Sequence, residues 1–521
     1  MGMLNALLAA FSLLSAGAGV ECGLPGAADG SGAARIVTAS RRNVEIVAAA
    51  EGAATGFRTG ETVDLRQADG GTFVAKVLDV TATSQGAILF FDRDLPPLKI
   101  GSTPVCRDPA SVRCVGPWRI AVAFGGRETE FDVEPAEVVA VMDEPASPFV
   151  PAPDADPFAR PILPKGYVAD NLTAPDAYVP GSMRVKSLNG EVYSPAADFL
   201  VSERWGSVAA TTNRVYGKDV LISYRYAKAR IDSVTVDGAG RLAYVKGTGD
   251  PVMPRPPEIA DGVRRLANVI VRGRTVALSD ENLFPVRPKA GRAAASAAEP
   301  VTRRLLPKTW RKLSEGGTLR LMAWGDSVTG GAFVPEASRL HRLYERELKR
   351  RFPQAKVEAT SNGWGGHRTD HFLNAPKGHR FNFAESVIGR KPDLVCMEFV
   401  NDAELSEEAA YGHYRQVAEA FRAAGIEWVA TTPHYTIPGW FMGEAKSVKG
   451  LQDDPRACVR ALRRVTSEYG VPLMETSRRW GELEYEGIPY DTLYVNAINH
   501  PCAEAMALYA EEFGKLFGKG L

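Results

Sequence analysis

From about residue 303 onward the sequence alternates between short apolar runs and longer amphipathic segments, and this alternation constrains the fold more than any other feature. The apolar runs predict strands at 319–324, 356–360, 393–399, 426–432 and 471–474. The amphipathic segments predict helices at 336–351, 405–424, 454–468 and 502–517. Strands separated by helices indicate a parallel sheet that is covered on both faces. Ligands of such sheets bind beyond the carboxyl ends of the strands, so the chemistry is expected there.

Polar motifs follow three of the predicted strands directly. The first strand runs into Gly-Asp-Ser, which ends at Ser327, and the second runs into a glycine-rich segment that ends at Gly366. Asn401 follows the third strand, and His500 precedes the last predicted helix. A serine hydroxyl is a weak nucleophile until a base takes its proton, and His500 is the base that we expect for Ser327.

These four motifs, in this order, resemble the sequence blocks of the SGNH (GDSL-type) hydrolases over about residues 318–517. The resemblance implies a flavodoxin-like three-layer α/β sandwich with a parallel sheet. It also implies a serine esterase or lipase that needs no metal and no cofactor. Ester hydrolysis passes through an oxyanion that needs donors held in place. By resemblance these are the backbone N–H groups of Ser327 and Gly366 and the side-chain amide of Asn401.

Two positions depart from the pattern of that family. Phe399 stands two residues before Asn401, where the family usually has glycine, and Ala497 stands three residues before His500, where the family has its acid. An acid in that role holds the imidazole in the required tautomer and stabilises the imidazolium. Its role is open to a backbone carbonyl or to one of three nearby side chains, Asn496, Asn499 and Asp491. A Ser–His pair without an acid is the other option.

Two further histidines are predicted to contact the substrate. His367 follows Gly366 directly, and His434 follows the fourth predicted strand. A turn histidine is the alternative for His367. The other motifs also have plain structural interpretations: the glycines as a tight turn, Asn401 as a helix cap, and His500 as an exposed loop residue. Asp326 is expected to stabilise the turn that presents Ser327.

A chain of 521 residues is too long for one ordinary core. We predict two β-rich domains at 34–142 and 165–286, linkers at 143–164 and 287–302, and a hydrolase domain at 303–521. The first linker is indicated by seven prolines between residues 145 and 164. Both β-rich regions lack histidine, so neither offers a histidine base of its own. A fragment from about residue 300 is expected to fold and act alone.

Residues 1–18 have the pattern of an export signal. Met3 to Ala18 is uncharged, rich in Leu and Ala, and ends in a small-x-small cleavage pattern. The segment carries no Lys or Arg, and a buried N-terminal helix is the alternative. It is too short for a comfortable membrane span. An extracytoplasmic location, secreted or periplasmic, is therefore expected.

Charge and cysteine usage narrow the classes of partner. Lys and Arg number 62, as do Asp and Glu, which gives no electrostatic case for nucleic acid. None of the six cysteines forms a CxxC pair, so we expect no structural zinc site. Cys106 and Cys114 enclose a short polar loop and are predicted to form a disulfide in an exported protein.

The sequence therefore favours an exported serine esterase that cleaves acyl or acetyl esters of a small molecule or a glycan. The carbohydrate assignment rests only on the analogy that β-rich appendages often bind glycans. One alternative is a cell-surface binding protein with a degenerate, inactive hydrolase domain, which Ala497 favours. Another is acyl transfer to a sugar by the same residues.

Overall fold

The computed structural model describes residues 35–47, 62–82, 86–102, 105–106, 110–124, 127–146, 155, 161–286, 300–451 and 454–518. They fall into two compact units. The first contains the described residues up to Ser111 together with Ala123–Glu128, and the second contains Val112–Val122, Thr129–Val286 and the chain from Ala298 on. The predicted export signal at 1–18 lies outside the described residues. Within them, no helix has the length and apolar character needed to cross a membrane.

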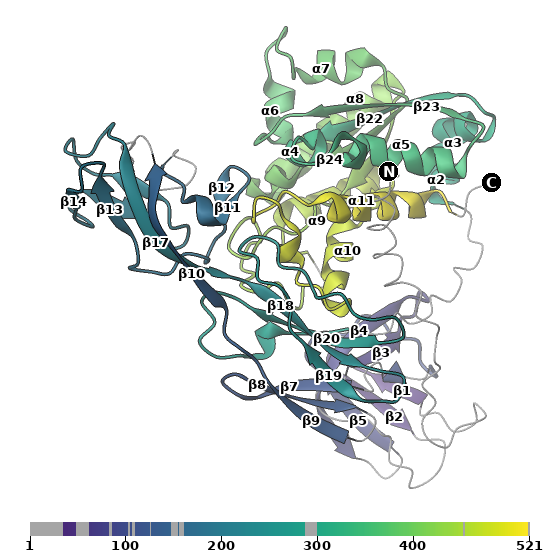
Figure 1. The fold of residues 1–521 in the computed structure, drawn as a ribbon. Helices are drawn as coiled ribbons and strands as arrows, with labels where there is room; N and C mark the ends of the chain where they lie inside the picture. The colour runs from purple at the N-terminus through teal and green to yellow at the C-terminus, as the bar shows by residue number, and fades with distance from the viewer. Residues whose placement is uncertain are drawn as a thin grey trace. The chain divides into compact units, whose positions relative to one another are not determined.

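The first unit is built on a six-stranded antiparallel sheet with the order β1-β2-β5-β4-β3-β6 (Figure 1). Alternate residues of a strand point to one face, and in the second strand Val44 and Ile46 are fully buried while Asn43, Glu45 and Val47 are partly exposed. The strands are β1 (Arg35–Ala39), β2 (Asn43–Val47), β3 (Thr62–Arg66), β4 (Thr72–Ala82), β5 (Gly86–Phe91) and β6 (Val105–Cys106).

Three further strands form a sheet of their own, namely β7 (Ala110–Gly116), β8 (Arg119–Phe124) and β9 (Arg127–Asp132). Cys114 lies in β7 and carries a free thiol, whereas Cys106 lies in β6 of the six-stranded sheet. The predicted disulfide between Cys106 and Cys114 is therefore wrong, because the sulfur of Cys114 is not bonded to another cysteine.

The second unit begins with antiparallel β structure. One four-stranded sheet has the order β10-β17-β13-β14, another has the order β19-β18-β20-β21, and β11 with β12 and β15 with β16 form two small hairpins. The strands are β10 (Glu137–Ala146), β11 (Val168–Ala169), β12 (Leu172–Thr173), β13 (Arg184–Ser187), β14 (Val192–Tyr193), β15 (Phe199–Val201), β16 (Val208–Ala210), β17 (Val220–Lys228), β18 (Arg230–Val236), β19 (Leu242–Val245), β20 (Arg264–Val271) and β21 (Leu283–Pro285).

The rest of the second unit is an α/β fold around a five-stranded parallel sheet, as predicted. The strand order is β23-β22-β24-β25-β26, which is the flavodoxin-like order 2-1-3-4-5 when the strands are counted along the chain. The strands are β22 (Thr318–Gly325), β23 (Lys356–Gly363), β24 (Leu394–Glu398), β25 (Glu427–Thr431) and β26 (Leu473–Met474). Each of them overlaps one predicted strand.

Helices cover both faces of this sheet (Figure 1). The longer ones are α3 (Pro307–Ser314), α5 (Leu340–Arg351), α8 (Glu407–Ala424), α9 (Ala457–Tyr469) and α11 (Ala503–Leu516). Helix α8 starts where the Ser406 side chain accepts a bond from the backbone N–H of Ala409, and it ends at Gly425, whose φ of 67° is left-handed. Both are typical helix caps.

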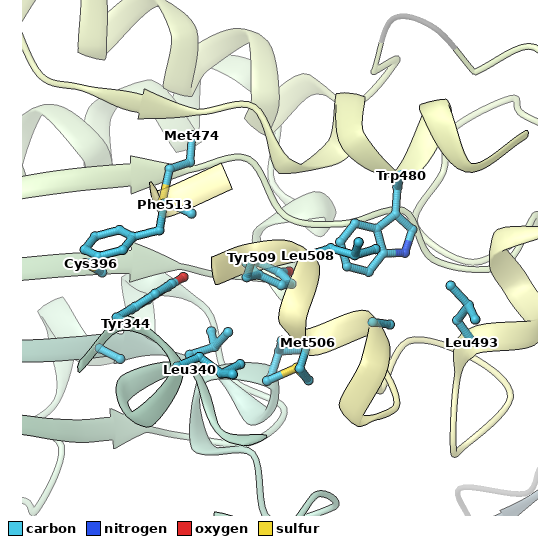
Figure 2. Close-up of a cluster of buried hydrophobic side chains, with 14 of the residues drawn as sticks. Leu340, Tyr344, Cys396, Met474, Trp480, Leu493, Met506, Leu508, Tyr509 and Phe513 are labelled. Carbon is cyan, nitrogen blue, oxygen red and sulfur yellow. The ribbon is translucent and has the colours of Figure 1, made fainter. Parts of the chain in front are cut away.

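The side chains of successive residues of β22 pack alternately into two separate cores. Leu321 and Ala323 pack with α5 and α11, whereas Met322 and Trp324 pack with α8 and α9 on the opposite face. Figure 2 shows the first of these cores, where Tyr344, Phe513 and their neighbours lie against the sheet. Because side chains alternate between the two faces of a sheet, a strand covered on both faces needs apolar residues at nearly every position, as this run has.

The antiparallel part of the second unit contributes to the first of these two cores. Its members there are Leu172, Trp205, Ile231, Ile270 and Phe284, all of them buried. Conversely, Ala497 packs in the apolar cluster that contains Tyr167 and Ala169. Residues 165–286 and 303–521, which the sequence predicted as separate domains, therefore share buried contacts within one compact unit.

Candidate active site

Ser327 stands at the first residue of a short helix, α4 (Ser327–Gly330), immediately beyond the carboxyl end of β22. The Asp326 side chain caps this helix, because its Oδ1 accepts a hydrogen bond of 3.0 Å from the backbone N–H of Val328. Gly325 is required by space, since a Cβ there would lie 1.9 Å from the backbone oxygen of Glu398. The strand, the glycine and the cap together fix the position of the serine.

Asp326 also connects the serine turn to Asn401. Its Oδ2 accepts a bond of 3.0 Å from the backbone N–H of Asn401 and one of 2.9 Å from the side-chain Nδ2. The carboxyl group is fully buried, and burial raises its pKa to about 7, although these backbone bonds oppose the rise. Because an amide nitrogen carries two hydrogens, the bond to Asp326 orients the Asn401 amide and leaves its second N–H for another acceptor.

His500 lies against Ser327, as the sequence predicted for its base. The Nε2 atom of His500 is 3.1 Å from Oγ of Ser327. The imidazole stacks on the Phe333 ring, with 4.3 Å between centroids and 10° between planes. Burial lowers the pKa of His500, and the carboxylate of Asp170 opposes that change. A neutral imidazole whose Nε2 accepts the serine proton carries its own proton on Nδ1.

The loop that carries His500 is organised by Asn496. Its Oδ1 accepts bonds from the backbone N–H groups of Ile498, Asn499 and His500, and its Nδ2 donates to Asn499 Oδ1. Both asparagine side chains are therefore engaged within the loop and not with the imidazole. Asp491 forms an ion pair of 2.8 Å with Arg272. The three side chains that the sequence offered for the acid role all have other partners.

His434 bonds the backbone of the same loop. It is fully buried, its Nε2 donates to the backbone oxygen of Asn499 at 2.8 Å, and its Nδ1 accepts from the Tyr509 hydroxyl at 2.8 Å. Burial lowers the pKa of His434 to about 3, so the ring is neutral. Contrary to the prediction from sequence, this histidine has no free nitrogen and no exposed surface for a substrate.

The glycine-rich segment lies beside the serine. Gly363 ends β23, where a Cβ would lie 2.3 Å from the backbone nitrogen of Gly330, and Gly365 lies against the Cβ of Ser327. Gly366 has a φ of 72°, a left-handed conformation that favours glycine. His367 is half-buried, its Nδ1 donates to the Gly365 oxygen at 2.7 Å, and its ring stacks on Trp364 at 3.8 Å.

Sequence reasoning missed two residues that contact the imidazole. Phe333 lies in the loop after α4, where no motif marks it. Asp170 lies in the two-residue turn between β11 and β12, and its Oδ2 is 3.7 Å from Nδ1 of His500. The only sequence signal there is Asp170-Asn171, a pair of residues common in tight turns. Among the described residues, no group of three or more His, Cys, Asp or Glu side chains is arranged to hold a metal ion.

Replacing Asn401 by alanine is expected to lower kcat for small esters by about 100- to 1,000-fold, while KM changes little. The reason is that the second amide N–H, oriented by Asp326, is proposed to bond the oxyanion that exists only in the transition state. Steady-state kinetics with nitrophenyl acetate would measure the effect. An increase in KM at constant kcat would instead make Asn401 a contact for the bound substrate.

The Ala497→Asp variant, which places an acid where the family has it, is expected to gain no activity. Ala497 is 6% exposed in an apolar cluster, so an aspartate there should lower the free energy of unfolding by about 2–4 kcal/mol without raising kcat. Burial would raise its folded-state pKa above the unfolded value, so the loss of stability should grow as the pH rises above about 4.

The matched control is Ala497→Asn, which has the same shape and suits the left-handed φ of 57° at this position but carries no charge. Melting temperatures of the two variants between pH 4 and pH 8 should diverge as the aspartate ionises. Equal stability of both variants at all pH values, with a higher kcat for the aspartate, would mean that the family's acid position is usable here.

Comparisons with known proteins find similarity at the level of structure. No family model matches the chain. No curated protein matches it either. A two-domain esterase active on acetylated mannans, co-crystallised with mannopentaose, is 18% identical over 40% of this chain and 52% of its own, with a TM-score of 0.32.

Two other solved structures are matched over nearly their full length. A mutant of Axe2, an acetyl-xylooligosaccharide esterase from Geobacillus Stearmophilus, is 15% identical over 38% of this chain and 94% of its own, with a TM-score of 0.31. LAE5, an α/β hydrolase from the metagenome of Lake Arreo in Spain, is 18% identical over 39% of this chain and 95% of its own, with a TM-score of 0.30. Proteins named as SGNH and G-D-S-L family members are also among the similar structures. At such identities and TM-scores these likenesses carry no assignment of substrate or site.

Proposed function

We propose that this protein is a serine esterase of the SGNH type that cleaves small acyl esters, acetyl esters among them. The observation that carries the proposal is the 3.1 Å approach of His500 Nε2 to Ser327 Oγ at the carboxyl end of a parallel sheet. Buried side chains hold both residues in place. Asp326 caps the helix that begins at Ser327, and Asn496 bonds the backbone N–H of His500. We also propose that the protein acts outside the cytoplasm, since residues 1–18 have the pattern of an export signal.

The first half of the proposed reaction acylates the serine. Oγ of Ser327 attacks the ester carbonyl carbon while His500 Nε2 takes the hydroxyl proton. The carbonyl oxygen becomes an oxyanion, which accepts bonds from the backbone N–H groups of Ser327 and Gly366 and from Asn401 Nδ2. As the tetrahedral intermediate collapses, the C–O bond to the leaving alcohol breaks and His500 returns the proton to that oxygen.

The second half repeats these steps with water. His500 takes a proton from a water molecule as its oxygen attacks the acyl carbon, and the same three donors hold the second oxyanion. Collapse then breaks the bond to Oγ, Ser327 regains its proton from His500, and the acid is released. No step needs a metal or a cofactor. If a sugar hydroxyl replaced the water, the same residues would transfer the acyl group instead.

An acylated carbohydrate is the substrate class that we propose. His367 lies half-buried on Trp364 beside the glycine-rich loop, where a ring of the substrate could rest against it. A panel of acetylated oligosaccharides, assayed for released acetate beside nitrophenyl acetate, would test this class. Cleavage of the small ester alone, with no oligosaccharide deacetylated, would contradict it.

A fluorophosphonate probe tests the catalytic serine directly. The probe should label the full chain, and peptide mapping should place the label on Ser327, because only a serine activated by a base reacts readily. The Ser327→Ala variant is the control. A chain that is neither labelled nor active on esters would instead support the alternative that Ala497 favours, a binding protein with a degenerate site.

A further inference from the structure

We propose that Asp170, on the β11–β12 hairpin of the antiparallel region, is the positioning acid of His500 and takes the role that Ala497 leaves empty. This inference rests on the proposed function and extends it, because it makes the β-rich region part of the esterase site. Residues 327 and 500 then come from the α/β part, and the acid comes from a segment more than 150 residues before the serine.

The first support is the environment of Nδ1. Oδ2 of Asp170 is 3.7 Å from this atom, which is otherwise buried and has no hydrogen-bond partner among the described residues. Since Nε2 of His500 accepts from Ser327, Nδ1 must carry the proton and needs an acceptor. The distance is slightly longer than a hydrogen bond. Such bonds are often long in free enzymes and shorten when the substrate is bound.

The second support is the rigidity of the hairpin. Ala169 and Leu172, which pair across the turn, are both 2% exposed, and Leu172 belongs to the core of the α/β part. Thr173 donates to the backbone oxygen of Trp205 at 2.7 Å, which ties the hairpin to the neighbouring loop. The turn that carries Asp170 is therefore fixed next to the imidazole by packing on both strands.

The third support is the backbone of the turn. Asp170 has a φ of 56°, and glycine is the usual residue at such a position in a two-residue hairpin. A left-handed residue that is not glycine costs about 1–2 kcal/mol, although aspartate tolerates it better than most. Backbone strain of this kind collects at functional sites. A carboxylate that contacts His500 gives the aspartate a reason to be there.

The fourth support links Asp170 to the missing acid. Ala497 packs in the cluster that contains Ala169, the residue next to Asp170. The apolar cluster that surrounds the family's acid position therefore also includes the strand residue that leads directly to Asp170. A carboxylate at 497 would lie at a position that is 6% exposed, whereas the side chain of Asp170 is 44% exposed and keeps contact with solvent.

The electrostatic surroundings of His500 agree with this role. Asp170 from the hairpin is the charged group next to the ring, the Ser327 hydroxyl from α4 bonds its other nitrogen, and His434, which interacts with His500 electrostatically, is neutral. Phe333 covers one face of the ring and carries no charge. Asp170 opposes the lowering of the His500 pKa by burial. The carboxylate therefore stabilises the imidazolium that forms when the serine proton is taken.

The experiment compares Asp170→Asn with Asp176→Asn in the full chain. Asp176 is a matched control, because it also has a left-handed φ, of 63°, and it pairs with Arg274 and not with the site. An acid in this role can contribute up to about 10⁴-fold in rate when it is buried. Asp170 is 44% exposed, so we expect kcat/KM to fall by about 10- to 100-fold for Asp170→Asn.

The pH profile separates a positioning role from a merely structural one. The active form needs neutral His500, so the acid limb of kcat/KM reports its pKa. Loss of the nearby carboxylate removes a stabiliser of the imidazolium, and the limb should move to lower pH by up to about one unit. NMR titration of the His500 imidazole, assigned with His500→Ala, should show the same shift. Asp176→Asn should change neither.

Two results would overturn the inference: an unchanged His500 pKa in Asp170→Asn, or a kcat/KM equal to that of Asp176→Asn. If the unmodified chain hydrolyses no ester, the proposed function fails, and the NMR titration alone then decides whether Asp170 acts on His500. A fall of the His500 pKa in Asp170→Asn would support the contact in that case, and no fall would overturn it.

Discussion

Ser327→Ala is expected to lower kcat for nitrophenyl acetate by about 10⁴-fold or more, because it removes the attacking oxygen, which is the oxygen bonded to His500 Nε2. Among the described residues, the only hydrogen bond of the Ser327 side chain is the one to His500. The turn itself is held by Asp326 and Gly325, which the substitution leaves intact. The melting temperature should therefore stay nearly unchanged.

The same reasoning predicts that the effects of the pair are not additive. Ser327→Ala combined with His500→Ala should be no slower than either single variant, since a base without its nucleophile has nothing to activate. Ser314→Ala is the control, because Ser314 ends α3 before the amino end of β22, whereas Ser327 follows the carboxyl end of that strand. Turnover that survives Ser327→Ala undiminished would rule out this serine as the nucleophile.

Much of the α/β part could be predicted from the sequence, because the signals are local. The apolar run at 319–324 became Thr318–Gly325, and the amphipathic segment at 336–351 became a helix from Leu340 to Arg351. Both strand boundaries moved by one residue, the start of the helix moved by four, and its end at Arg351 did not move. The predicted positions of Ser327 and Asn401 at strand ends followed from the same pattern.

What could not be predicted depends on contacts between distant segments. His434 follows a strand, which suggested a place at the site, yet its environment is set by Tyr509 and by the backbone of Asn499. Asp170 lies in a hairpin whose strands have two residues each, too short to produce a period. No local sequence pattern indicates that His434 is buried or that Asp170 lies next to His500.

A fragment that begins at residue 298 is expected to lose more than about 99% of the activity and much of the stability of the full chain. The sequence predicted that such a fragment folds alone. In the structure, five buried apolar side chains from residues 172–284 complete its core, among them Ile231 and Phe284. Burying one side chain of this size stabilises by about 1.5–3 kcal/mol, so their loss is comparable with the whole stability of a domain, about 5–15 kcal/mol.

The matched control is a fragment of residues 112–521, which keeps the second compact unit whole, including Asp170 and the buried residues around it. We expect it to melt cooperatively and to hydrolyse nitrophenyl acetate at nearly the rate of the full chain. Circular dichroism and steady-state kinetics on both fragments would measure the difference. If the fragment from 298 equals the longer one in both respects, the α/β part is an independent enzyme, and neither the shared core nor Asp170 is needed. If only the longer fragment is active, the antiparallel region is part of the catalytic unit, because the carboxylate beside His500 and the packing around Ala497 are absent from the shorter one.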